Sequence, residues 1–347
     1  MRIFEGYRKG VNLGGWLSQF DRYDKVHFET FIQKKDIEDI ASLGFDHVRV
    51  PVDYNVLQDE EANRIDSGFG YLKACREWCE EYGLNMIIDL HECYGYSFDP
   101  LKKDMDREKF FYDTNLQDRF FDLWKEIARE FKDYPLQVAF EPLNEVVLIE
   151  VADAWNVVLE RYIEEIRAIA PETYLILGGV CYNNVSTVPF IDIPVDPYIV
   201  YNFHCYEPMI FTHQGAYWVE GMPEDFRIGY PKSLEEYRKA GDSLEADLAG
   251  AIYREGISEP GPAFFEDIFK PAVEKALKDD VPLYCGEYGV IDLADPESNL
   301  RWLKDIHTAF RNFGIGSALW NYKEKDFGFV NEAFAPIKDR FMQIVQS

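Results

Sequence analysis

Two glutamates stand at the ends of short apolar runs, where a pair of carboxyl groups could act on one bond. Glu145 closes the run 138–145 (VAFEPLNE), and Glu287 lies within 282–289 (PLYCGEYG). Cleavage of a glycosidic bond needs two such groups, one as proton donor and the other as nucleophile or base. A separation of about 5–5.5 Å gives retention of configuration and a wider one gives inversion. The two glutamates are therefore candidate catalytic residues.

Other polar and aromatic side chains follow runs of the same kind. An ionised nucleophile needs hydrogen-bond donors nearby, and Arg49 and Tyr206 are the natural candidates. The proton donor needs a pKa raised by burial and by the neighbouring charge. Asn144 can hydrogen-bond a sugar 2-hydroxyl, a contact that strengthens in the transition state. Trp320 offers a flat apolar face on which a pyranose ring can stack.

Each of these residues taken alone has a simpler structural explanation. A single histidine such as His91 or His204 is more often a hydrogen-bonded core residue than a catalytic one. A site is favoured because a titratable or aromatic group ends nearly every apolar run. A metal site is the competing interpretation, but the chain has no His-Glu-x-x-His motif and no zinc-type Cys/His spacing, so we expect no metal or cofactor. In the metal interpretation, the ligands would be His91, Glu92, His204 and Glu287.

The apolar runs predict the elements that position these residues. They are nearly continuous in hydrophobicity, which is typical of parallel strands buried on both faces. Eight strands alternating with helices predict a single (β/α)₈ TIM barrel over residues 1–347, with its active site at the carboxyl ends of the strands. A doubly wound sheet is disfavoured because no glycine-rich fingerprint follows the first run. The predicted strands are 11–16, 47–51, 85–91, 138–145, 174–180, 199–206, 282–289 and 316–322, and the helices are 36–43, 71–82, 117–132, 154–168, 265–277 and 297–313.

The interval between the sixth and seventh strands is too long for one barrel unit. Its polar excess, residues 212–262, contains several aromatic residues and the helical run 244–253. We interpret it as a helical subdomain inserted after the sixth strand. Loops after the strands lie at the catalytic face, so the insertion is expected to wall the cleft; a purely stabilising role is the alternative.

Composition limits the partners. The 63 acidic and 36 basic residues give a net charge of −27, which argues against nucleic acid and anionic membranes. No apolar run is long enough to cross a membrane. Residues 1–10 lack an apolar segment, so we expect no signal peptide, and both an intracellular site and secretion with the leader removed stay open. The six cysteines are expected as buried free thiols, and the chain as a monomer.

Six motifs, in this order along the chain, resemble the signature of glycoside hydrolase family 5. They are Arg49-x-Pro51, Asp89-x-His91, Leu143-Asn144-Glu145, His204-x-Tyr206, Gly286-Glu287-Tyr288-Gly289 and Trp320. The resemblance covers essentially the whole chain. It implies a (β/α)₈ barrel with a retaining mechanism, in which Glu145 is the acid/base and Glu287 the nucleophile.

The resemblance also implies roles for the remaining candidates and shows one departure. Members often carry a second histidine after the position of His91, where this chain has Glu92. The following residues 93–96 (CYGY) also differ from the usual Ala-Pro-Gly. Reshaped subsites on the non-reducing side are therefore expected. The implied roles are support of Glu287 by Arg49, His204 and Tyr206, and sugar binding by His91, Asn144 and Trp320.

The expected activity is that of a retaining endo-β-glycanase on neutral β-1,4 or mixed β-1,3/1,4 glucan. A β-mannanase or an exo-β-glucosidase on the same scaffold is the alternative, because an axial 2-hydroxyl changes what Asn144 must accept. A catalytically silent carbohydrate-binding barrel and a metal-dependent hydrolase are two further alternatives. Binding without turnover would indicate the first, and loss of activity in chelator the second.

Overall fold

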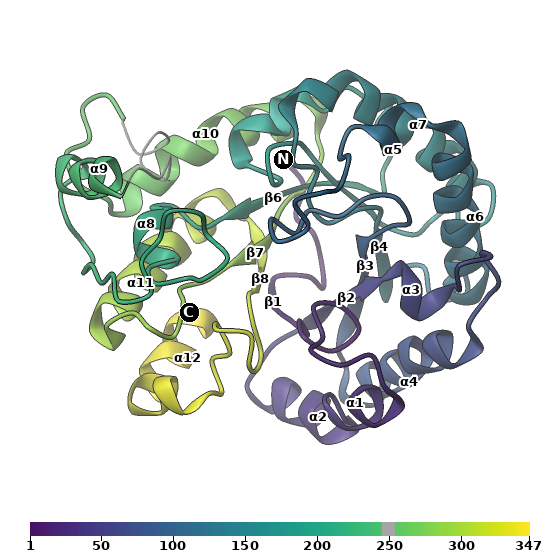
Figure 1. Cartoon of the computed structure of the whole chain (residues 1–347), viewed down its shortest axis with the longest axis horizontal. Coiled ribbons are helices and arrows are strands. Elements are labelled where there is room, and N and C mark those ends of the chain that lie inside the picture. The colour runs from purple at the N-terminus through teal and green to yellow at the C-terminus, as the bar shows by residue number, and fades with distance from the viewer. Residues whose placement is uncertain (245–253) are drawn as a thin grey trace.

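Eight parallel strands close into a barrel in chain order, and β1 completes the ring by pairing with β8 (Figure 1). The computed structural model describes residues 1–244 and 254–347. This architecture confirms the predicted (β/α)₈ barrel. The strands are β1 (Lys9–Asn12), β2 (His47–Asp53), β3 (Asn85–Glu92), β4 (Val138–Glu141), β5 (Leu175–Gly178), β6 (Ile199–Cys205), β7 (Leu283–Tyr288) and β8 (Gly316–Leu319).

Three strands end three or four residues earlier than the sequence predicts. β1 ends at Asn12, β4 at Glu141 and β8 at Leu319, so the last residues of the predicted runs 11–16, 138–145 and 316–322 are irregular backbone. In β4 the physical reason is Pro142, which follows the strand and has no N–H to donate to a ladder. Those predicted bounds are therefore wrong, and Glu145 and Trp320 lie beyond the strands that lead to them.

The helices surround the barrel, as Figure 1 shows, and bury one apolar face each. In α6, Phe120, Trp124 and Phe131 are buried against the strands, and Asp113 caps the helix by accepting hydrogen bonds from two backbone N–H groups. The helices are α1 (Lys25–Thr30), α2 (Lys34–Ser42), α3 (Tyr54–Leu57), α4 (Asp66–Tyr82), α5 (Lys109–Tyr112), α6 (Thr114–Phe131), α7 (Ala152–Arg167), α8 (Met209–Thr212), α9 (Leu234–Ser243), α10 (Pro262–Asp279), α11 (Pro296–Phe313) and α12 (Lys338–Gln346).

The segment after β6 forms a lobe beside the barrel that contains α8 and α9 (Figure 1). Arg301 of α11 fastens this lobe to the barrel by donating to the Tyr230 carbonyl at 2.7 Å. Asp305, also on α11, accepts from the Tyr230 hydroxyl at 2.9 Å. Of the predicted helical run 244–253, residues 245–253 lie outside the described residues, and Leu244 is the C-cap of α9.

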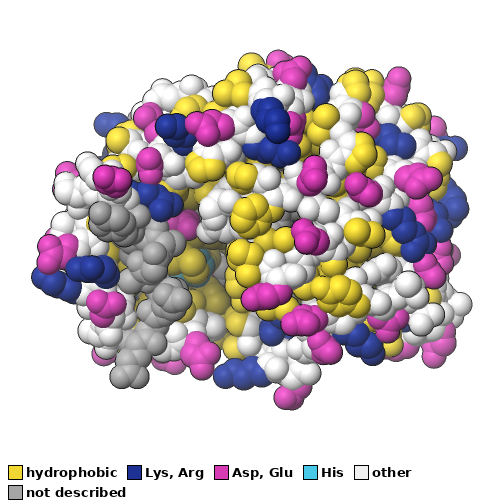
Figure 2. Space-filling view, turned by 90° about the horizontal axis from the view of Figure 1, so that it is seen from above, with side chains coloured by type: hydrophobic (Ala, Val, Ile, Leu, Met, Phe, Trp, Pro, Cys, Tyr) yellow, Lys and Arg dark blue, Asp and Glu magenta, His cyan; other side chains and the backbone are white. Residues whose placement is uncertain are grey.

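The six cysteines are all free thiols, in agreement with the sequence prediction. Five are buried, whereas Cys181, after β5, is only half-buried, so the expectation that all six are buried is wrong for that residue. Over the described residues, no helix is long and apolar enough to cross a membrane. Figure 2 shows acidic side chains spread over one face, with basic side chains interspersed among them.

Two glycines of α4 provide a matched test of how closely this helix packs. A Cβ at Gly68 would lie 1.9 Å from the Val56 carbonyl oxygen of α3, whereas a Cβ at Gly70 would meet nothing within 4 Å. We expect Gly68→Ala to lower the free energy of unfolding by about 1–3 kcal/mol, because backbone has to move. Gly70→Ala should leave it unchanged or raise it by up to ~1 kcal/mol. Urea unfolding of the two variants checks this, and equal stabilities would contradict it.

Candidate active site

Arg49 on β2 is a fully buried cation that contacts three carboxylates at the centre of the barrel mouth. Its guanidinium pairs with Glu141 through two hydrogen bonds of 2.7 and 2.9 Å. It also donates to Glu287 at 2.7 Å and lies 3.0 Å from Asp89. Burial raises the pKa of Asp89 and the pKa of Glu141 to about 7, and the Arg49 charge opposes this rise.

Two asparagines complete the ring of acceptors around Arg49. Asn12 on β1 accepts from Nη1 at 2.9 Å, and Asn144 accepts from Nη2 at 2.8 Å. Asn144 thus has its carbonyl oxygen held by the arginine. Its Nδ2 is buried and has no hydrogen-bond partner, so it is free to donate to a bound molecule.

Glu287 on β7 is the carboxylate with the more strongly charged and polar environment. Arg49 donates to its Oε1 at 2.7 Å, and the Tyr206 hydroxyl donates to its Oε2 at 2.9 Å. Burial raises the pKa of Glu287, while the Arg49 charge and the Tyr206 hydrogen bond lower it. The sequence analysis named both donors. Two donors on two oxygens hold this group in one orientation and favour its ionised form.

Glu145 lies beyond β4 and faces Glu287 across the mouth. One carboxylate oxygen of each glutamate and a His204 ring nitrogen all lie within 4.8 Å of one another. Burial and then the charge of Glu287 raise the pKa of Glu145 well above its usual range. The protonated form is therefore favoured more strongly at Glu145 than at Glu287, where Arg49 and Tyr206 oppose the effect of burial, and an acid and nucleophile pair requires a difference in this direction.

His204 on β6 does not hydrogen-bond the carboxylate that was expected. Its Nδ1 lies 2.7 Å from Glu145 and 3.8 Å from Glu287, so the predicted support of Glu287 is replaced by a bond to Glu145. Glu145 reaches the ring because it extends from irregular backbone rather than from a strand. Burial lowers the pKa of His204 well below its usual range, and the imidazole is neutral near pH 7.

His91 and Trp320 form the side of the site where an apolar ring face is offered. Their rings lie parallel at 3° with centroids 5.8 Å apart, and the Phe98 ring packs edge-on against His91 at 4.9 Å. Asp89 fixes His91 through Nδ1 at 2.6 Å. The opposite nitrogen, Nε2, is buried without a partner. A planar surface next to an unsatisfied polar atom suits a sugar ring with its hydroxyl groups.

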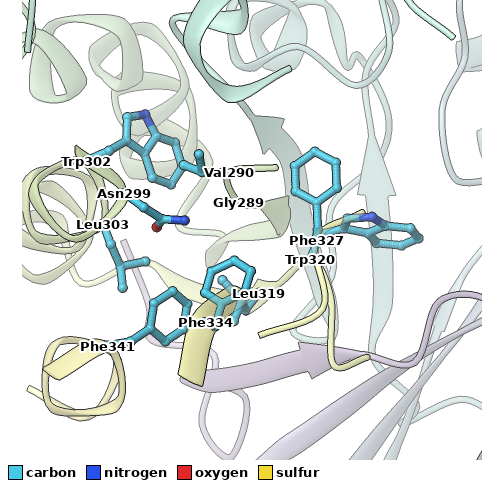
Figure 3. Close-up of a pocket in the computed structure, with 10 residues that line it drawn as sticks. All are labelled: Gly289, Val290, Asn299, Trp302, Leu303, Leu319, Trp320, Phe327, Phe334 and Phe341. Carbon is cyan, nitrogen blue, oxygen red and sulfur yellow. The ribbon is translucent and has the colours of Figure 1, made fainter. Parts of the chain in front are cut away.

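Trp320 packs against apolar residues of three loops. Ala216 from the segment after β6, Ile291 after β7 and Phe327 after β8 cluster with it. Figure 3 shows Phe327 beside Trp320 at one end of a gap lined by residues of α11 and α12. This gap is too narrow to admit a water molecule, so it belongs to the packing that holds the indole in place.

Glu92, the departure from the family pattern, is hydrogen-bonded to the loop that follows it. Its carboxylate accepts hydrogen bonds from Ser97 and from Lys102, both in the loop after β3. The buried Asp53 of β2 stands next to Glu92 in the sheet register. Burial and then the charge of Glu92 raise the pKa of Asp53 well above its usual range. Glu92 thus anchors the loop that carries Phe98.

Sequence reasoning missed part of this network. Glu141, Asn12 and Asn202 were not singled out, yet Asn202 donates to Glu141 at 2.9 Å and Glu141 forms the two-bond pair with Arg49. A charged residue inside the buried run 138–145 was the available signal, because a buried carboxylate requires a cation. The metal interpretation named His91, Glu92, His204 and Glu287 as ligands. Among the described residues, the one group with suitably close ligand atoms joins His204 and Glu287 to Glu145 and contains neither His91 nor Glu92.

The sequence and the fold of this chain are similar to those of known proteins. A family model described as Cellulase (glycosyl hydrolase family 5) matches residues 8–326. The chain is 38% identical to Endoglucanase C of Acetivibrio thermocellus, covering 98% of each protein. It is 40% identical to Cellodextrinase A of Ruminococcus flavefaciens, covering 89% of this chain and 84% of that one. Thermotoga maritima Cel5A in complex with cellobiose has the same fold, with a TM-score of 0.75 at 23% identity over 99% of this chain and 100% of that one.

Replacing the central cation tests the electrostatics of the site. Arg49→Met leaves Asp89, Glu141 and Glu287 buried without a counter-charge, so we expect a loss of about 3–5 kcal/mol in the free energy of unfolding near neutral pH. Arg340→Met is the matched control, because Arg340 forms a two-bond pair with the exposed Glu297, and little change is expected.

The sign of the pH dependence follows from the raised pKa values. Asp89 and Glu141 have folded-state pKa values near 7 in the parent, and these rise further when the Arg49 charge is absent. At pH 5 both carboxyls are largely protonated in parent and variant alike. At pH 8 the parent ionises them beside Arg49, whereas the variant must keep them protonated or bury them ionised without a counter-charge, and either state costs free energy of folding. The loss in free energy of unfolding caused by Arg49→Met, measured by urea unfolding, should therefore be larger at pH 8 than at pH 5. A deficit that grows toward acid would contradict this account.

Proposed function

The chain belongs to glycosyl hydrolase family 5, and we propose that it is an endo-acting, retaining hydrolase of β-1,4 or mixed β-1,3/1,4 glucan. That it is a β-glycanase follows from the family. The observation that carries the mechanism is the pair Glu145 and Glu287, with carboxylate oxygens no more than 4.8 Å apart. This approach supports a retaining rather than an inverting pair, because an inverting pair needs room for a water between the two groups.

The first step joins the sugar to the protein. Glu287 attacks the anomeric carbon through a carboxylate oxygen, and the bond from that carbon to the leaving oxygen breaks. Glu145 gives its proton to the leaving oxygen as the bond opens. Arg49 and Tyr206 favour this division of roles, because both donate hydrogen bonds to Glu287 and keep it ionised.

The second step releases the sugar. Glu145, now ionised, takes a proton from a water molecule, and the water oxygen attacks the anomeric carbon. The ester bond to Glu287 breaks, which restores both glutamates and returns the product with its original configuration. His204, held against Glu145 at 2.7 Å, maintains the orientation of that carboxyl through both steps.

The remaining residues of the site support sugar binding. The free Nδ2 of Asn144 is placed to donate to a 2-hydroxyl, and the Trp320 indole to stack under the ring. We also propose that residues 212–262 wall the cleft on this side. Two residues of that segment support this role, since Ala216 belongs to the apolar cluster of Trp320 and Trp218 packs against it.

Substitution of the nucleophile tests the mechanism. Glu287→Ala removes the only group proposed to attack the anomeric carbon, so we expect turnover to fall by at least ~10³-fold. Binding of cellotriose, measured by titration calorimetry, should be largely retained. Glu207→Gln is a matched control, because Glu207 is also buried and follows the neighbouring strand β6, but it pairs with Asn184 at 3.3 Å.

Two results would contradict the retaining scheme. A Glu287→Ala protein that keeps most of its activity would remove Glu287 as the nucleophile. Proton NMR of the first product provides the second check, because retention requires the β-anomer to form before it mutarotates. An α-anomer formed first would mean inversion, and Glu287 would then have to act as a base.

A substrate panel tests the specificity. We expect reducing sugar from carboxymethylcellulose and barley β-glucan, with a rapid fall in viscosity, and little from laminarin, xylan or galactomannan. The same activity is expected in the presence of a chelator. Activity mainly on galactomannan would establish the mannanase alternative. Release of only mono- or disaccharides from short oligosaccharides would establish exo action, an alternative supported by the similarity to Cellodextrinase A.

A further inference from the structure

The backbone that carries Glu145 lies outside the sheet. β4 ends at Glu141, and residues 142–147 have no regular hydrogen-bond ladder. The Asn144 N–H donates to the Leu90 carbonyl at 3.1 Å, which ties the beginning of this segment to β3. The groups further along need other partners, because buried backbone N–H and C=O groups are almost always paired.

One tyrosine hydroxyl satisfies the backbone on both sides of Glu145. The Tyr96 O–H donates to the Glu145 carbonyl at 2.6 Å, and the same oxygen accepts from the Val147 N–H at 2.9 Å. No other side chain in the described parts of the chain hydrogen-bonds those two groups. The hydroxyl of Tyr96 therefore acts as a bridge that sets the path of the chain through Glu145.

Tyr96 is itself held rigidly. Its side chain is 1% exposed, and its ring packs against Phe110 and Phe111 with centroids 6.0 and 5.6 Å away. Its backbone N–H closes a turn to the Cys93 carbonyl at 3.0 Å. The next residue, Ser97, hydrogen-bonds Glu92. The anchored loop after β3 thus holds the Tyr96 hydroxyl in a fixed position against the backbone of Glu145.

A strained turn holds the same segment from the opposite side. Residues 181–183 have φ values of 54°, 57° and 55°, a left-handed run in which none is glycine. The N–H of Tyr182 in this turn donates to the Val146 carbonyl at 3.0 Å. Such backbone persists only where its surroundings fix it. Residues 145–147 are therefore clamped between two loops, after β3 and after β5.

We propose that Tyr96 is a positioning residue for proton transfer by Glu145, which it serves through the backbone without touching the sugar. The proposal rests on the proposed function, since it assumes that Glu145 protonates the leaving oxygen. Without the hydroxyl, the Glu145 carbonyl and the Val147 N–H lose their shared partner. The segment then shifts, and the carboxyl proton no longer points along the bond that breaks.

The test separates proton transfer from the rest of the reaction. Tyr96→Phe is assayed for kcat/KM on cellotetraose, whose leaving sugar needs a proton, and on 2,4-dinitrophenyl β-cellobioside, whose leaving group departs without one. We expect kcat/KM to fall by at least ~10-fold on cellotetraose and to stay within ~2-fold on the aryl glycoside. A purely structural role would lower both by the same factor, namely the lost fraction of folded protein.

Two reference variants make the result interpretable. Tyr7→Phe is the matched control, because Tyr7 is also fully buried and donates to a backbone carbonyl, that of Leu136, at 3.2 Å. It should leave the ratio of the two kcat/KM values unchanged. Glu145→Ala should show the largest selective loss, in which kcat/KM falls on cellotetraose but not on the aryl glycoside. If Glu145→Ala lowers both values equally, the proposed role of Glu145 fails. If Glu145→Ala is selective while Tyr96→Phe lowers both values equally or neither, only the role of Tyr96 is overturned.

If the Tyr96→Phe protein does not fold, a milder variant tests the same role. Phe110→Leu loosens the packing of the Tyr96 ring but keeps the hydroxyl, so the same selective loss is expected at smaller size. An unchanged ratio of the two kcat/KM values in folded Phe110→Leu, together with an unfolded Tyr96→Phe protein, would overturn the positioning role and assign Tyr96 to stability alone.

Discussion

Arg49 imposes the constraint around which the barrel mouth is arranged. A guanidinium without access to water has to be surrounded by acceptors. Four strands and one loop supply them in the form of Asn12, Asp89, Glu141, Glu287 and Asn144. Since the positions of these groups are determined by one rigid planar cation, they are also determined relative to one another. The orientation of the nucleophile candidate is set by this arrangement. Burying Asp89 and Glu141 raises their pKa values, which is the electrostatic cost of placing these carboxyls around a buried cation.

The two glutamates are held by different means, and this difference explains their different chemistry. Glu287 belongs to β7, whose ladder fixes its backbone. Its carboxylate is held by a guanidinium and a phenol, and both of these donors favour negative charge. Glu145 stands on irregular backbone and contacts a neutral imidazole, which does little to oppose the effect of burial on its pKa. These different surroundings support the proposed division of roles between an acid/base and a nucleophile of the same residue type.

Continuity of hydrophobicity was enough to predict the barrel, because parallel strands inside it are apolar on both faces, as β2 and β3 show. It could not predict where β1, β4 and β8 end, since the apolar character of 11–16 and 138–145 continues into loops that pack against the site. The order of the motifs singled out Glu145, Glu287, Arg49 and Tyr206, and the structure brings these side chains together. The partner of His204 and the role of Glu141 depend on side-chain reach across the barrel, which spacing along the chain does not encode.

The loop position of Glu145 has a consequence for how activity relates to folding. Its neighbouring backbone groups are paired with Tyr96 and Tyr182 of two loops, while the backbone around Glu287 is part of the closed sheet. Segments of this first kind open with less free energy than the sheet requires. Amide hydrogen exchange would therefore divide the two glutamates into separate cooperative units. On this basis we expect warming to abolish activity by local opening around Glu145 while the barrel is still intact, so that thermal inactivation precedes thermal unfolding.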